Sequence, residues 1–156
     1  MKDHGYTLVE MVLVIVVLGI LSAVAIPQYI NMQTQSRVNS LNNLSAALSS
    51  VVAVVRSGYY ANNRVSPVTM ENGASIAVTT TSGVAALGAP TVASIASAID
   101  TTGFTVTAAG GTPSGGTGPV PANTVQFDLG TPLANCYVRY FNNNTTQTTT
   151  PTTTGC

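Results

Sequence analysis

A single carboxylate lies inside an otherwise apolar stretch near the start of this chain. Residues 6–26 are almost wholly apolar and are long enough to cross the hydrocarbon core of a bilayer as a helix. Glu10 falls within them. An isolated carboxylate in a membrane segment costs roughly 2.5–3.5 kcal/mol on insertion scales, so such a residue indicates a functional site at which it has a partner.

Three kinds of segment fit this stretch. The first is a secretory signal peptide, for which Ala23-Val24-Ala25 would supply the cleavage site. Against it, Asp3 offsets Lys2 in the leading stub, and the apolar run exceeds the usual length of about 7–15 residues. Glu10 would also serve no purpose in a disposable signal. The second is a plain membrane anchor, and the third depends on the motif at residues 5–10.

That motif reads Gly5-Tyr6-Thr7-Leu8-Val9-Glu10 and follows a five-residue stub that carries charge. It resembles the class III signal of type IV prepilins, a resemblance carried by the first 30 residues of the chain. The resemblance implies cleavage between Gly5 and Tyr6 by a prepilin peptidase, followed by N-methylation of Tyr6. Tyr6 stands where the family more often has Phe.

The same resemblance implies a role for Glu10 in assembly. In the family, this carboxylate pairs with the terminal amine of a neighbouring subunit, which offsets the cost of burying both charges. Pairing with the amine of its own Tyr6 is the alternative in a lone membrane subunit. The family also implies a single-pass protein of the inner membrane that assembly machinery builds into an extracellular pilus.

The apolar stretch continues into a second, amphipathic stretch without an intervening loop. Together they predict one helix from Tyr6 to Ser57, with Gly58 as its C-cap. Gly19 and Pro27 interrupt it, and Pro27 predicts a bend or a local loosening. In the pilin family the segment between these two residues loses helix in filaments, whereas a static kink is the alternative for an isolated subunit. The apolar stripe of the second half consists of Ile30, Val38, Leu41, Leu44, Leu48, Val51, Val52 and Val55.

Short β-like segments, separated by turn residues, follow a loop at residues 59–73. A short helix is predicted at 90–100, and a Gly- and Pro-rich loop at 109–121. The tail after residue 141 is polar and of low complexity, so it has little reason to order except through Cys156. The predicted strands are Ser75–Thr81, Gly103–Thr107, Thr124–Leu129 and Cys136–Phe141.

These elements predict an α+β fold, a long helix packed on a small antiparallel sheet, which resembles the type IVa pilin fold. Residues 27–48 look most like the mannose-sensitive haemagglutinin pilins. The predicted organisation is a leader at 1–5, a membrane or filament-core helix half at 6–27, an amphipathic half at 28–58 and a β-rich head at 59–156. Within the head, residues 136–156 form a disulfide-bounded region.

Two cysteines, Cys136 and Cys156, predict a disulfide, because an even count in an exported chain is typical of one. Two free thiols are the alternative. Closing a loop of this size stabilises a fold by about 3 kcal/mol in the chain-entropy model. The tail also offers hydroxyl acceptors for O-glycans, at Thr148, Thr149, Thr150, Thr152, Thr153 and Thr154.

Charge and composition argue against several classes of function. Only 6% of the residues are charged, against about 25% in a typical domain, and no basic patch for nucleic acid is present. The one histidine, His4, lies in the stub, so histidine-based catalysis has no residue to use. Glu71, Asp100 and Asp128 are far apart in sequence and form no calcium-loop pattern. Neither an enzyme nor a cofactor or metal site is expected.

The sequence therefore predicts the structural subunit of a type IV pilus, a helical homo-oligomer for adhesion, motility or surface attachment. A type II secretion pseudopilin is one alternative, but such proteins often bind calcium where this chain has Thr and Asn. A DNA-uptake minor pilin is another, although Arg56, Arg64 and Arg139 are too few for a basic stripe. A non-pilin exported β-domain is the last, and the mature N-terminus distinguishes it.

Overall fold

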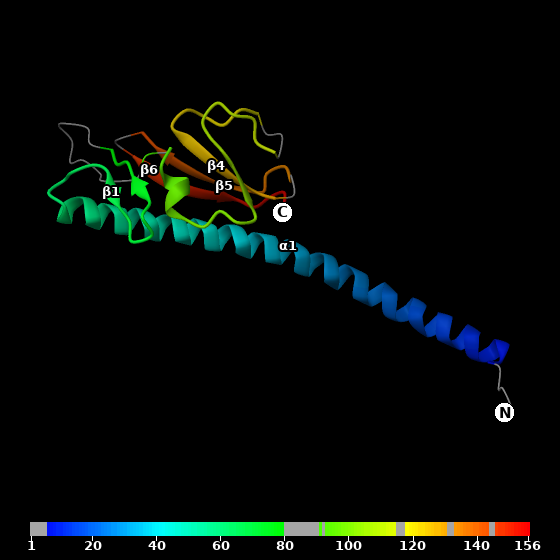
Figure 1. Cartoon of the computed structure of the whole chain (residues 1–156). Helices are drawn as coiled ribbons and strands as arrows, with labels where there is room; N and C mark the ends of the chain where they lie inside the picture. Colours follow the sequence, from blue (N-terminus) through cyan, green and yellow to red (C-terminus); the bar gives the residue numbers. More distant parts are fainter. Residues whose placement is uncertain (1–5, 80–90, 92, 115–117, 131–132, 144–145) are drawn as a thin grey trace. The chain divides into compact units, whose positions relative to one another are not determined.

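One long helix precedes a small antiparallel sheet in the computed structural model of the chain (Figure 1). The structure describes residues 6–79, 91, 93–114, 118–130, 133–143 and 146–156. The chain divides into two compact units, residues 1–36 and 37–156, and the second is called the head below. The α+β fold predicted from the sequence is confirmed.

Helix α1 spans Leu8–Ala61 and includes Gly19 and Pro27. It ends four residues beyond the predicted end at Ser57, so the prediction of Gly58 as the C-cap is wrong. Gly58 is instead a packing residue, since a Cβ there would lie 3.0 Å from Cγ1 of Val68. Asn63 takes the left-handed conformation, with φ of 51°, and Arg64 N–H bonds to the carbonyl of Tyr59, as at the end of many helices.

The head buries one face of α1. Its buried residues recur every three or four positions, which is the spacing of one helix face. Ile30, predicted as the first member of this stripe, is 57% exposed and lies in the other unit. The buried residues of α1 are Leu41, Leu44, Leu48, Val52, Val55 and Tyr59.

The main sheet has four antiparallel strands in the order β3-β4-β5-β6. Three of them lie within one residue of the predicted bounds: β3 at Phe104–Thr107, β4 at Thr124–Leu129 and β5 at Tyr137–Asn142. Alternation of β-branched and aromatic residues was a reliable guide here because one face of the sheet is apolar. Val125, Phe127, Val138 and Tyr140 join the helix residues in the core.

Smaller elements differ from the predictions. The predicted strand at 75–81 is only β2, Ser75–Ile76, which pairs with β1, Val68–Thr69, inside the predicted loop; Thr80 and Thr81 lie outside the described residues. The predicted helix at 90–100 is a single 3-10 turn, η1, at Ile95–Ala98. Pro90 and Val92, which supported that helix, lie outside the described residues, as do residues 115–117 of the predicted loop.

The prediction of an unstructured tail is wrong. Residues Gln147–Thr152 form strand β6, and each of them pairs with a residue of β5. The polar composition gave no reason to expect an ordered tail. Strand β5, however, offers a row of backbone hydrogen-bond partners, and the β-branched threonines of the tail suit a strand. An unpaired β5 edge would leave these backbone groups without partners.

A disulfide between Cys136 and Cys156 closes the end of this strand pair, as predicted, so the alternative of two free thiols is wrong. Three further contacts surround it. Gly155 N–H bonds to the carbonyl of Asn135, and a Cβ at Gly155 would collide with the backbone of Ala134. Arg37 of α1 donates a 3.3 Å hydrogen bond to the carbonyl of Cys156. The disulfide therefore joins a region that is also held by hydrogen bonds and close packing.

A buried polar cluster lies on the sheet face away from α1. Gln126 and Asp128 alternate with the core residues of β4 and are 0% and 2% exposed. Gln126 donates a 2.8 Å hydrogen bond to Asp128 Oδ1 and accepts one of 2.8 Å from Arg139 Nε. The Arg139 guanidinium also lies 4.5 Å from the ring centroid of Tyr137. Asp128 Oδ2 is buried without a hydrogen-bond partner among the described residues.

The cluster makes the stability of the head depend on pH. Burial raises the pKa of Asp128, and its hydrogen bond from Gln126 and the charge of Arg139 only partly oppose this. A raised pKa in the folded state means that the contribution of Asp128 to stability is largest at low pH and is lost as pH rises through that pKa. Asp100 acts in the opposite direction, because hydrogen bonds from Thr102 lower its pKa.

Asp128→Asn is expected to stabilise the head at neutral pH, because it removes a charge that burial disfavours and keeps an acceptor for Gln126. The gain in Tm over the wild type should grow from about pH 3 to about pH 7, the range that surrounds the ordinary carboxyl pKa. Thermal unfolding of the full chain in detergent would measure it. The control, Asp100→Asn, should be less stable than the wild type at neutral pH, with a gap that closes as pH falls. A constant gain for Asp128→Asn across the range would contradict the assignment.

Candidate functional site

The predicted site residues fall into two groups in the structure. Tyr6 and Glu10 lie together at the start of α1, and Gly19 and Pro27 lie further along its first unit. The disulfide and the tail threonines belong to the head. Gly5, the predicted residue before the cleaved bond, lies outside the described residues.

Glu10 makes its hydrogen bonds with Thr7, in the first turn of α1. Oε2 of Glu10 accepts one bond of 2.8 Å from the backbone N–H of Thr7 and another of 2.8 Å from its hydroxyl. In return, Thr7 Oγ1 lies 3.3 Å from the backbone nitrogen of Glu10 and accepts its hydrogen bond. The carbonyl of Thr7 also accepts the first bond of the helix, from Met11. This is a capping box, in which the N-cap residue and the third helical residue satisfy each other.

The capping box was missed in the sequence analysis, which assigned Glu10 only a terminal amine as partner. The signal was available, because Thr-x-x-Glu ahead of an apolar run is the sequence pattern of such a box. Glu10 is thus bonded to Thr7 of its own subunit.

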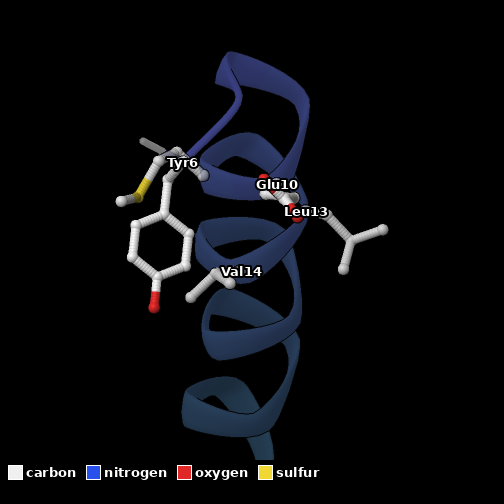
Figure 2. A pocket seen from close by; sticks show the side chains of 5 residues that line it. Tyr6, Glu10, Leu13 and Val14 are labelled. Atoms are coloured by element: carbon white, nitrogen blue, oxygen red, sulfur yellow. The ribbon is translucent and has the colours of Figure 1, made fainter. Parts of the chain in front are cut away.

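A shallow hollow surrounds the carboxylate (Figure 2). It is lined by Tyr6, Glu10, Met11, Leu13 and Val14. In Figure 2 the Tyr6 ring and Val14 lie on one side of the helix, Leu13 points away on the other, and Glu10 lies between them. One acidic group among apolar side chains suits a single cationic partner in apolar surroundings.

The rest of the first unit presents apolar side chains outward. By length and composition, α1 is apolar enough to cross a membrane. Ser22 needs no partner outside the helix, because its hydroxyl donates a 2.7 Å bond to the carbonyl of Leu18. The exposed large apolar residues of this unit are Tyr6, Leu8, Val9, Met11–Leu18, Ile20, Leu21, Val24, Ile26, Tyr29, Ile30 and Met32.

The tail threonines differ in exposure. Thr148, Thr150 and Thr154 are exposed, whereas Thr149, Thr152 and Thr153 are half-buried. The hydroxyl of Thr149 is itself buried, without a hydrogen-bond partner among the described residues. An attached sugar could not be accommodated at Thr149 without opening β6. The part of the chain that the structure describes contains no group of three or more His, Cys, Asp or Glu residues that could hold a metal ion.

Comparison with known proteins agrees with the motif at residues 5–10. The family described as the prokaryotic N-terminal methylation motif matches residues 1–26. The chain is also similar to the type IV narrow pilus major component PilA5 of Thermus thermophilus, with 35% identity over 54 residues. No solved structure matches the chain.

The similarity to PilA5 is partial, since it covers 35% of this chain and 47% of that protein. The chain therefore spans about half the length of the relative that it matches. The methylation motif lies where the capping box and the exposed apolar helix begin, and the head has the helix, antiparallel sheet and disulfide expected of the fold. These findings show that the chain is similar to type IV pilins, in its N-terminal motif and in its fold.

Proposed function

We propose that the protein is the subunit of a type IV pilus and polymerises through residues 6–27 into a helical surface fibre. The observation that carries this proposal is the exposed apolar surface of the first unit, which bears one acidic group at its start. Before assembly this surface lies in the inner membrane, and after assembly it lies against other copies in the extracellular fibre. Adhesion, motility or surface attachment is the purpose of the fibre.

Energetics support a transfer between these two environments. Fourteen large apolar side chains between Leu8 and Ile26 are exposed, and placing them in water would cost roughly 20–40 kcal/mol at about 1.5–3 kcal/mol each. Moving them from lipid to a bundle of identical helices costs little, because both surroundings are apolar. Assembly machinery would have to supply the direction.

Two changes prepare the subunit for this transfer. A prepilin peptidase cuts between Gly5 and Tyr6, and the new amino group of Tyr6 is then methylated. The match of the methylation motif to residues 1–26 supports both steps. Removal of residues 1–5 leaves a positive amine at Tyr6, one helical turn from Glu10. In the fibre, Glu10 pairs with the amine of a neighbouring copy in the apolar hollow.

Two further features belong to the proposed fibre. Residues 19–27 are helical in the subunit, and we propose that they loosen in the fibre, where Pro27 leaves one helix carbonyl without its usual donor. O-glycans, if attached to the tail, are placed on Thr148, Thr150 and Thr154, whose side chains are exposed.

The mature protein is expected to start at Tyr6, with a methyl group on its nitrogen. Mass spectrometry of the purified subunit would measure this directly. Gly5→Val should leave the unprocessed precursor in the membrane, because a branched side chain prevents the backbone from lying in the protease groove. Ala25→Val is the matched control, and it should be processed normally. A mature chain that begins at Ile26 would instead indicate a secretory signal and would overturn the pilin function.

Glu10→Ala should be processed and abundant in the inner membrane but should form few or no fibres. Removing the carboxylate leaves the partner amine unpaired in an apolar core, at a cost of about 3–5 kcal/mol for each subunit added. The membrane subunit suffers no such loss, because insertion becomes easier without the charge. Fibres would be sheared from cells that lack the wild-type subunit and counted by electron microscopy. The control is Glu71→Ala, which removes an exposed carboxylate of the head. A normal yield from Glu10→Ala would show that the charge has no part in assembly.

A further inference from the structure

We propose that Thr7 is a positioning residue for Glu10: it holds one carboxylate oxygen and leaves the other for the amine of a neighbouring copy. The inference rests on the proposed function and names the residue that makes Glu10 able to perform it. Three hydrogen bonds carry it, all between these two residues.

The two oxygens of Glu10 have different surroundings. Oε2 accepts both bonds from Thr7, whereas Oε1 has no hydrogen-bond partner among the described residues. A carboxylate can accept more bonds than these two, so Oε1 is available to a further donor. The Tyr6 nitrogen takes no part in the box. The start of α1 thus offers Oε1 of Glu10 as an acceptor and, after cleavage, the amine of Tyr6 as a cation.

The hydroxyl of Thr7 is the group that only Thr or Ser can supply at this position. It donates to Oε2 of Glu10 and accepts from the backbone N–H of Glu10, so it connects the side chain and the backbone of the same residue. These bonds are stronger in apolar surroundings than in water, because no water competes for the carboxylate. The side chain of Glu10 is therefore folded back toward the start of the helix and has lost most of its rotational freedom before a neighbour arrives.

Fixing the carboxylate in advance matters at every subunit added. A free glutamate side chain loses rotamer entropy when it pairs, whereas one already held by Thr7 does not lose it again. The box also places the carboxylate beside residue 7, next to the position at which the chain is cleaved. Thr7 therefore acts on assembly through Glu10.

The first experiment measures the fibre yield by shearing and immunoblotting. The yield is expressed per mature subunit, so that a change in cleavage does not alter the result. Thr7→Val keeps the shape of the side chain and removes the hydroxyl. Its fibre yield should fall about tenfold, because losing one helix cap costs a free energy that corresponds to about this factor in an equilibrium constant. Thr7→Ser should restore the wild-type yield. The double variant Thr7→Val with Glu10→Ala should assemble no worse than Glu10→Ala alone, because Thr7 acts through Glu10.

The outcomes separate this inference from the proposed function. If Glu10→Ala forms no fibres and Thr7→Val forms as many as the wild type, the positioning role is refuted and the proposed function stands. If Glu10→Ala assembles normally, Glu10 has no part in assembly and the positioning role of Thr7 is refuted with it, while the proposed fibre stands. If the wild-type chain forms no fibres, the proposed function itself fails. A Thr7→Ser variant as poor as Thr7→Val would also refute the role, since its hydroxyl can make the same bonds.

The second experiment observes the capping box itself in the full-length chain, and it does not require cleavage. The sequence has two glutamates, Glu10 and Glu71, so glutamate labelled with ¹³C at the carboxyl carbon gives two NMR resonances in detergent micelles. Thr7→Val should shift the Glu10 resonance and Thr7→Ser should return it, while the exposed Glu71 serves as an internal reference. An unmoved Glu10 resonance in Thr7→Val would overturn the inference.

Discussion

The apolar side chains at the start of α1 must be kept away from water, and the features of the first unit follow from that constraint. They are exposed in the subunit, and their total hydration cost exceeds the net stability of a typical domain. Apolar surroundings must therefore cover them. Such surroundings accept polar atoms only when these are bonded, and the capping box of Thr7 and Glu10 and the Ser22 hydroxyl meet that condition within the helix itself.

The head differs from the first unit, because it buries most of its large apolar side chains within itself. Its core joins the buried face of α1 to the inner face of the sheet. Strand β6 pairs with β5 as the last strand of that sheet. The disulfide of Cys136 and Cys156 joins one end of this strand pair. Arg37 bonds to Cys156 at the first residue of the head, so the closed end of the sheet also holds the helix where the head begins.

Charge is used sparingly in both units. Glu10 is bonded to Thr7, Arg37 to a backbone carbonyl, and Arg139 to Gln126 beside Asp128. Neutral donors and acceptors, rather than opposite charges, satisfy most of these groups. Asp128 differs from these groups, because its buried charge is unfavourable. Burial raises its pKa, and its Oδ2 has no hydrogen-bond partner among the described residues.

The sequence by itself determined the features that depend on local pattern. The apolar run, the heptad-like spacing at residues 41–55 and the alternation in β4 and β5 predict α1 and the central strands, because periodicity follows directly from helix and strand geometry. The Gly5-Tyr6 motif and the cysteine pair were likewise recognised from the sequence alone. Only the tertiary structure decided that β6 forms, that α1 continues past Gly58 and that Gln126 and Asp128 are buried. Each involves contact with another element of the fold: β5 for the tail, Val68 of β1 for Gly58 and Arg139 of β5 for the cluster. Local composition carries no information about such partners, so a polar threonine tail can be a strand when a neighbouring edge needs one.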